Sequence, residues 1–194
     1  EDDYYAKTFR VYSRLLFCAC LCLIPLTKYI IIILTDNSYH MAWYYTAPLY
    51  IGTVYSALAS FMGVGYIGSK QTSKAFSTTA IAAIINIGIN IIFMPLFPAY
   101  GIAIASISTM VSYLTLFLIR NKQTKRYFDV KVSKIEIIFF TIINIACAVI
   151  IIKTNIIVDV MLFIISLLLS YVCLKEYITK IISFLKIKII AKKH

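Results

Sequence analysis

Three polar side chains lie inside long apolar stretches of the sequence, and their chemistry is where a function could reside. Lys28 is the only basic residue well inside such a stretch. A charge at membrane depth is costly and marks a functional site by default, and an ammonium group suits the phosphate of a lipid-linked cargo. The alternative is structural, because the long stem of Lys28 could carry its charge to the outer membrane surface. Lys28 is therefore a candidate for cargo contact, with the structural alternative open.

Asn86 and Asn90 are the other two candidates, one helical turn apart in the third apolar stretch. An amide without a partner in hydrocarbon costs several kcal/mol, so both need hydrogen bonds. One interpretation has them contact a polar cargo or water in a cavity. The other has them bond to a neighbouring helix, for example to the face of the next stretch that carries Ser108. We expect the second more than the first, and both residues stay cargo-contact candidates.

Groups that would indicate catalysis or metal binding are scarce in these stretches. Glu136 and Asp159 stand near the ends of theirs and no carboxylate lies deeper, which argues against a proton or sodium relay. The sequence has no Gly-rich phosphate loop, nucleophile motif or His-rich motif. Its cysteines have no zinc-type spacing and are typical of small apolar helix residues: Cys18, Cys20, Cys22, Cys147 and Cys173. The sequence therefore predicts no enzyme, no cofactor and no metal site.

The composition indicates which elements carry these residues. Hydrophobic residues make up 61% of the 194-residue chain and charged residues 14%, against roughly a quarter charged in soluble proteins. Six apolar stretches reach the roughly 17 to 25 residues that cross a bilayer as a helix. They cover residues 15–34, 43–66, 76–97, 101–119, 135–152 and 156–174. The fold class is therefore all-α, a polytopic membrane protein of about six transmembrane helices.

Basic residues set the expected orientation. Of the 19 lysines and arginines, 17 fall before the first stretch or at its start and after the second, fourth and sixth. The two exceptions are Lys28 and Lys153. Because basic loops stay on the cytoplasmic side, both ends of the chain are expected in the cytoplasm. The net charge of +11 then meets anionic lipid headgroups and no nucleic acid.

This pattern divides the chain into five parts. The tail from Glu176 onward is too charged to span, and a partial stripe of isoleucines suggests an interfacial helix, with a frayed basic tail as the alternative. The opening residues, Glu1 onward, include no initiator methionine, so we expect the N-terminal part of a longer protein to be missing. The parts are a cytoplasmic juxtamembrane segment (1–13), a four-helix part (14–120), a basic cytoplasmic loop (121–134), two peripheral transmembrane helices (135–175) and a basic interfacial tail (176–194).

Small and polar residues at helical spacing predict which helices meet. Such residues let helix backbones approach in lipid and form bonds across the gap. The second, third and fourth stretches each carry such a stripe, whereas the fifth and sixth are mainly large apolar residues. We therefore expect helices two to four to pack tightly and helices five and six to be peripheral. The helix-packing candidates are Gly52, Ser56, Gly63, Gly101, Ala105, Ser108 and Ser112.

Five short motifs, in order, resemble one family of transporters. They are Tyr39-His-Met-Ala42, Gly68-Ser-Lys70-Gln-Thr72, Asn86-Ile-Gly-Ile-Asn90, Met94-Pro95 and Tyr100-Gly101-Ile-Ala103-Ile-Ala105-Ser106. At these spacings the chain resembles the C-terminal half of the polysaccharide-transport flippases, within the multidrug/oligosaccharidyl-lipid/polysaccharide (MOP) exporter superfamily. The resemblance covers roughly residues 5–130. The outer turn that begins at Pro95 departs from it, because it is longer than usual.

The resemblance implies a transporter of about fourteen helices in two lobes that works by alternating access. Its cargo would be an undecaprenyl-diphosphate-linked oligosaccharide repeat unit, moved across the bacterial inner (cytoplasmic) membrane for capsule, O-antigen or similar polymers. Its partners would be this lipid-linked oligosaccharide, membrane lipids and the polysaccharide polymerase and chain-length machinery. The first helices of each lobe, which we expect to line the cargo cavity, would precede Glu1.

Other functions stay open from the sequence alone. Within the same superfamily, a flippase for the peptidoglycan lipid precursor is a close alternative, and a drug/cation antiporter is disfavoured by the shortage of deep carboxylates. From another class, a membrane-embedded polysaccharide polymerase or transferase would need catalytic side chains and a sizeable outer loop, neither of which the sequence offers. A structural or assembly subunit is a further alternative for the last two helices.

Overall fold

The computed structural model describes residues 2–125, 130 and 132–191, without the side chains of residues 2, 3, 176, 178 and 180–191. The structure is 92% helical, and no strand occurs within the described residues. Two short 3-10 segments interrupt the helices, at Asn37–Tyr45 and Pro98–Tyr100. The α-helices are α1 (Asp2–Leu34), α2 (Thr46–Gly68), α3 (Thr72–Leu96), α4 (Gly101–Thr124), α5 (Lys134–Ile151) and α6 (Ile156–Ala191).

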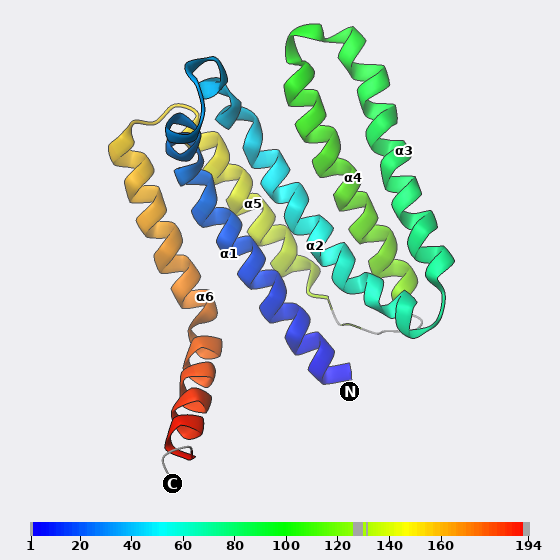
Figure 1. Ribbon diagram of the computed structural model, residues 1–194, viewed down its shortest axis with the longest axis vertical. Helices are drawn as coiled ribbons and strands as arrows, with labels where there is room; N and C mark the ends of the chain where they lie inside the picture. The colour runs from blue at the N-terminus through cyan, green and yellow to red at the C-terminus, as the bar shows by residue number, and fades with distance from the viewer. Residues whose placement is uncertain (1, 126–129, 131, 192–194) are drawn as a thin grey trace.

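Each of these six helices contains a segment long and apolar enough to cross a membrane, in the part of the chain that was described. Their apolar segments coincide with the six stretches of the sequence, because only a helix satisfies every backbone hydrogen bond within one segment in lipid. The prediction of an all-α protein with six membrane-spanning helices is confirmed. Successive helices run antiparallel (Figure 1).

The bundle has two groups of helices, α2 to α4 and α1 with α5 and α6, which meet where α1 packs on α2. α2 packs along α4 (Figure 1). α3 also packs on α4 and makes little contact with the other helices. α1 packs against α2 on one side and against α5 and α6 on the other. Aromatic side chains fill the space where α1, α2 and α5 meet. Phe17 is fully buried there, with its ring stacked on Phe140 at 5.7 Å between centroids and edge-on to Tyr55 at 6.2 Å.

Gly52 explains the close approach of α2 to α4. A Cβ atom at this position would lie 3.1 Å from the Cα atom of Met110 and 3.4 Å from its backbone nitrogen. Contacts this short to backbone cannot be relieved by rotating a side chain. Small residues allow such helix contacts in lipid, where dispersion attraction replaces the hydrophobic effect. Gly52 therefore sets the separation of these two helices.

The expected packing of α2 and α3 on α4 is confirmed, whereas the expectation that α5 is peripheral was wrong. Of its described side chains, α3 buries Thr78 and Ala82, so it is a peripheral helix. α5 instead belongs to the core, and α6 is largely exposed as expected. The small stripe of α3 specifies contact with one neighbour, whereas α5 is buried through the shape of large side chains, which composition does not reveal. The buried residues of α5 are Ile137, Phe140, Asn144, Cys147 and Ile151.

Two boundaries also differ from the sequence division. The juxtamembrane segment 1–13 is helical from Asp2 and packs into the bundle, with Phe9 and Ser13 buried. The basic loop 121–134 begins inside α4, which continues to Thr124, and residues 126–129 and 131 lie outside the described residues. Both helices extend because no glycine or proline stops them and because Phe9 contacts the Phe61 and Phe117 rings.

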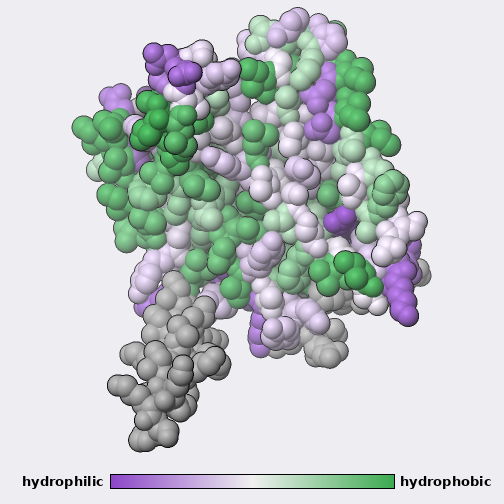
Figure 2. Space-filling model, in the orientation of Figure 1, coloured by the Kyte–Doolittle hydropathy of each residue, from purple (hydrophilic) through white to green (hydrophobic). Residues whose placement is uncertain are grey.

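One end of the bundle carries most of the described basic residues. We call it the basic end; it holds the start of α1, the α2–α3 turn, the end of α4 and the start of α5 (Figure 1). Its basic residues include Lys7, Arg10, Lys70, Lys74, Lys122, Lys125 and Lys134. Lys28 and Lys153 lie toward the opposite end. Apolar side chains dominate the flank formed by α6 (Figure 2).

The tail 176–194 belongs to α6 as far as Ala191. The helix extends past the end of the bundle in Figure 1. The isoleucine stripe that led us to expect an interfacial helix falls on side chains outside the described ones, so that expectation stays a prediction.

Candidate functional site

Lys28 is paired with a carboxylate on another helix. Its Nζ atom lies 3.9 Å from Oδ2 of Asp159, which is fully buried at the start of α6. The same carboxylate accepts hydrogen bonds from the hydroxyls of Tyr29, at 2.6 Å, and Thr154, at 2.5 Å. Lys28 also lies 5.3 Å from the centroid of the Trp43 ring.

These contacts give Lys28 a structural role at the outer end of the bundle, which joins α1 to α6. A buried carboxylate is tolerated only when it is paired and hydrogen-bonded, and Asp159 meets both conditions through α1 and through Thr154 in the turn before α6. The distance of 3.9 Å is an ion pair without a direct hydrogen bond. The structure therefore adds a partner for Lys28 on α6 that the sequence did not indicate, and cargo contact stays a prediction.

Asn86 and Asn90 form a hydrogen-bond network with α4. Nδ2 of Asn86 donates to Ser108 Oγ at 3.2 Å and to Thr109 Oγ1 at 3.3 Å. Nδ2 of Asn90 donates to the same Ser108 oxygen at 3.0 Å and to the Asn86 carbonyl at 2.9 Å. Ser108 is fully buried. The amides thus meet the Ser108 face, the helix-packing partner that the sequence predicted for them.

A pocket of about 300 Å³ opens beside this network, between α3 and α4. Its polar wall comes from an amide and three hydroxyl-bearing side chains of the two helices, and Tyr113 adds an aromatic hydroxyl. Thr79 and Ala83 are exposed at its mouth, and Asn86 is half-buried. Hydrophilic atoms gather along the seam between α3 and α4 in Figure 2. The lining residues are Thr79, Ala82, Ala83, Asn86, Ile87, Thr109, Ser112, Tyr113 and Leu116.

This pocket has the chemistry of a site for an uncharged polar ligand. Amides and hydroxyls both donate and accept, so they match the hydroxyl groups of a sugar, while an aromatic ring covers apolar ring faces. An outward-facing polar surface is unfavourable against hydrocarbon and needs protein or water in front of it. The Asn86 amide bonds to α4 and its side chain also lines the pocket, while its contact with a cargo stays a prediction.

A second pocket, of about 230 Å³, lies near the opposite end and is mainly apolar. It is bounded by Trp43, Ile51, Met110 and side chains of α5. Most of its lining side chains are apolar. We assign it no role in the candidate site.

Arg120 is the functional residue that sequence reasoning missed. It was counted as a charge of the cytoplasmic side, yet its side chain is buried within the bundle, at 8% exposure. Nε donates to Thr78 Oγ1 at 3.1 Å, Nη1 to the Ala59 carbonyl at 3.0 Å, and Nη2 to Thr79 Oγ1 at 3.0 Å and to the Ala75 carbonyl at 3.2 Å. The guanidinium thus joins α2, α3 and α4.

Among the described residues, the hydrogen-bond partners of the Arg120 guanidinium are all neutral oxygens. No carboxylate among these partners neutralises its positive charge. Thr79 connects the guanidinium directly to the mouth of the α3–α4 pocket. Gly63 makes room for it, because a Cβ there would lie 3.0 Å from Nη1. One feature of the sequence indicated that Arg120 is helical. No glycine or proline follows Ile119 before Thr124, so nothing ends the helix at the predicted boundary.

The remaining helix-packing candidates divide into two groups. Ser112 is buried, and Ser56 and Ala105 are half-buried, as expected for residues that face other helices. Gly101 is different, because no atom beyond its neighbours lies within 4 Å of a Cβ built there. It begins α4 after the 3-10 turn, where no described neighbour packs against it, so its packing role stays a prediction.

The search for metal sites covered the described residues, and no group of three or more metal-binding side chains occurs among them. In comparisons with known proteins, no family model, curated protein or solved structure matches the chain.

Proposed function

We propose that the chain is part of a membrane transporter that flips an undecaprenyl-diphosphate-linked oligosaccharide across the bacterial inner membrane for surface polysaccharide assembly. The observation that carries the proposal is the pocket between α3 and α4, whose lining includes an amide and three hydroxyl-bearing side chains and whose mouth is exposed. The motifs that resemble the C-terminal half of the polysaccharide-transport flippases supply the cargo class.

The physical argument starts from the solvent. Six apolar helices place the chain in lipid, where the spare acceptor sites of the pocket's hydroxyl oxygens have no partner unless the pocket faces water or protein. A transporter with a central polar cavity removes this conflict, because the second lobe stands opposite and water fills the space between. Hydroxyl and amide groups then replace the water around sugar hydroxyls during transit.

The positive charge beside the pocket also supports the transport proposal. A diphosphate moving past the bundle needs a positive potential, and Arg120 supplies one at the basic end of the pocket without a carboxylate to neutralise it among its described partners. Lys28 lies toward the other end of the bundle, beside Asp159, and is not part of the pocket lining.

Deleting the gene that encodes the chain tests the proposal. Lipid-linked oligosaccharide should accumulate in the cytoplasmic leaflet, and surface polymer should disappear. Accumulation of the peptidoglycan lipid precursor instead would reassign the cargo to that rival. Loss of polymer with fully translocated repeat units would point to a polymerase or transferase and overturn the transport proposal.

Pocket variants connect the phenotype to the site. Ala83→Leu should fill the mouth of the pocket and reduce transport, because Ala83 is exposed and its backbone is not moved by a longer side chain. Thr109→Val removes a lining hydroxyl at nearly constant volume and should reduce transport as well. Thr115→Val is the matched control, since Thr115 also donates to the carbonyl four residues earlier but does not line the pocket. Equal transport in all three variants at equal membrane abundance would exclude the pocket.

A further inference from the structure

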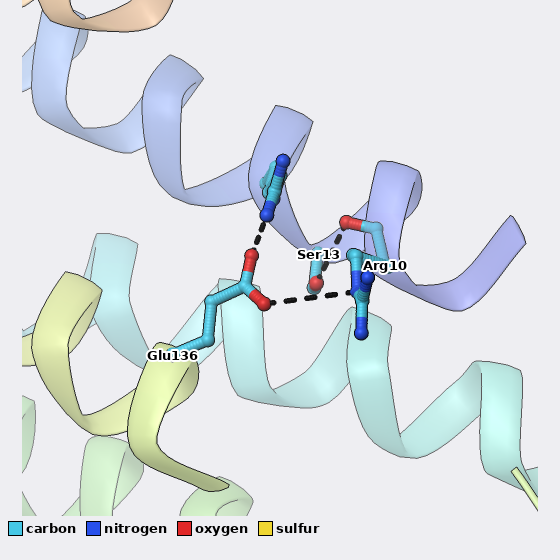
Figure 3. Close-up of polar contacts among 4 residues, drawn as sticks. Arg10, Ser13 and Glu136 are labelled. Carbon is cyan, nitrogen blue, oxygen red and sulfur yellow. Dashed lines mark hydrogen bonds and ion pairs between the residues drawn. The ribbon is translucent and has the colours of Figure 1, made fainter. Parts of the chain in front are cut away.

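Two arginines share one carboxylate where α1 meets the start of α5 (Figure 3). Nε of Arg14 donates to Oε1 of Glu136. Nε of Arg10 lies 3.8 Å from the second oxygen, Oε2, an ion pair too long for a hydrogen bond. Ser13 lies between the arginines on α1 and donates to the Arg10 carbonyl at 3.0 Å. The cluster of Arg10, Arg14 and Glu136 therefore contains one more positive charge than negative charge.

That surplus charge resides on Arg10. Glu136 is committed to Arg14 by the direct hydrogen bond, and its side chain is 19% exposed. The Arg10 side chain is 54% exposed, twice the 27% of Arg14. A guanidinium presents five N–H donors in a planar fork that fits two oxygens of a phosphate. The exposed fork of Arg10 is therefore available to a phosphate without breaking the Arg14–Glu136 bond.

The surroundings of Arg10 suit a ligand that stays at the surface. Phe9, Arg10, Ser13, Ser133 and Glu136 border a cleft between the helices of only about 10 Å³, so a phosphate would rest at its mouth. Ser133 is exposed there and makes no side-chain capping hydrogen bond to α5. Lys134, the next residue, is exposed and adds a second positive charge. No acidic side chain other than Glu136 borders the described cleft.

The depth of the cluster distinguishes a lipid phosphate from a soluble one. The apolar stretch of α1 begins near Leu15 and that of α5 near Ile135. Arg10 lies five residues before Leu15, about 8 Å along the helix, and Glu136 lies in the first turn of α5. Polar headgroup regions occupy roughly 5 to 8 Å on each side of the hydrocarbon. The cluster therefore lies near the level where lipid phosphates lie.

From this geometry we propose that Arg10, with Ser133 beside it, binds the phosphate group of an anionic membrane lipid at the basic end of the bundle. Glu136 holds Arg14 and keeps the two guanidinium groups from repelling each other, while Arg10 receives the lipid. The bound lipid then joins the start of α1 to the start of α5. The inference does not depend on the cargo, because the cluster lies apart from the α3–α4 pocket.

Native mass spectrometry of the full-length protein, with phosphatidylglycerol or phosphatidylcholine added, tests this site. The wild type should retain phosphatidylglycerol in preference to phosphatidylcholine. Arg10→Gln should weaken phosphatidylglycerol binding by roughly three- to tenfold. Glu136→Gln should leave both guanidinium groups available and strengthen it. Lys153→Gln, an exposed change at the opposite end, is the matched control and should leave binding unchanged.

Two results would overturn the proposal. Equal retention of phosphatidylglycerol by wild type and Arg10→Gln would show that Arg10 does not bind it. Displacement of the lipid by inorganic phosphate at equal concentration would assign the site to a soluble anion. The midpoint of thermal unfolding in detergent is measured for each variant to show that it is folded. Arg10 is more than half exposed, so Arg10→Gln is expected to fold, and Glu136→Gln gives an independent change of opposite sign.

Discussion

The guanidinium of Arg120 on α4 lies 3.1 Å from the hydroxyl of Thr78 on α3, measured from Nε to Oγ1. Through Nη1 the same side chain also donates to a main-chain carbonyl of α2, that of Ala59. α2 and α3 have little direct contact with each other. Arg120 therefore links two helices that α4 would otherwise hold separately, and it does so beside the α3–α4 pocket.

Arg120→Met should destabilise the bundle. Methionine fills much of the same volume but leaves the Ala59 and Ala75 carbonyls without their charged donor, a loss of about 2 to 3 kcal/mol. We expect the midpoint of thermal unfolding in detergent to fall by about 5 °C or more. Lys122→Met is the matched control, because Lys122 is exposed on the same helix. Equal midpoints for the two variants would show that Arg120 does not join the helices.

Gly52→Ala and Gly88→Ala should change stability in opposite directions. Both replace a helical glycine by alanine, which by itself favours the helix by roughly 0.5 to 1 kcal/mol. At Gly52 the new Cβ would lie 3.1 Å from the Met110 Cα, and overpacking of this kind costs about 1 to 3 kcal/mol. At Gly88 no described atom lies within 4 Å, so the gain remains.

Thermal unfolding of the two glycine variants in the same detergent gives the comparison. Gly52→Ala should unfold below the wild type and Gly88→Ala at or above it. A stabilising Gly52→Ala would mean that α2 and α4 are farther apart than the structure places them.

Lys28→Met should lower stability without a specific effect on transport. The change leaves the buried Asp159 carboxylate with only its two hydroxyl donors, at a cost of about 2 kcal/mol. Asp159→Asn in the same protein removes the charge that Lys28 balances. The double variant should therefore lose less than the sum of the single losses, with a coupling of about 1 kcal/mol or more.

Unfolding of the wild type, both single variants and the double variant measures that coupling. Lys153→Met, an exposed neighbour at the same end, is the control. Loss of polymer display by Lys28→Met at full stability and abundance would instead return Lys28 to the cargo site.

Cysteine labelling should place the basic end in the cytoplasm. After the five native cysteines are replaced by alanine, Asn155→Cys should react with an impermeant maleimide on intact cells. Lys70→Cys, in the α2–α3 turn, should react only after permeabilisation, because basic turns remain on the cytoplasmic side. The reverse pattern would invert the topology and remove the orientation on which the transport proposal depends.

The sequence by itself determined the helices. Runs of apolar residues as long as a bilayer is thick can satisfy their backbone only as helices, so length and hydropathy were enough to find all six. The Asn86 and Asn90 pair was also readable, because two amides one turn apart in lipid demand a partner and the Ser108 stripe offered one. These are local requirements, met within one helix or between sequence neighbours.

Only the tertiary structure decided where the charges end. Lys28 and Asp159 are 131 positions apart in the sequence, and nothing local connects them, yet the packing of α6 on α1 brings their side chains together. In the sequence Arg120 belongs to a run of basic residues that is typical of a cytoplasmic loop. In the structure α4 continues past Arg120 and places its guanidinium between α2 and α3. The burial of α5 follows from how Phe140 fits against Phe17. Shape complementarity between distant helices sets these contacts, and hydropathy along one helix does not encode it.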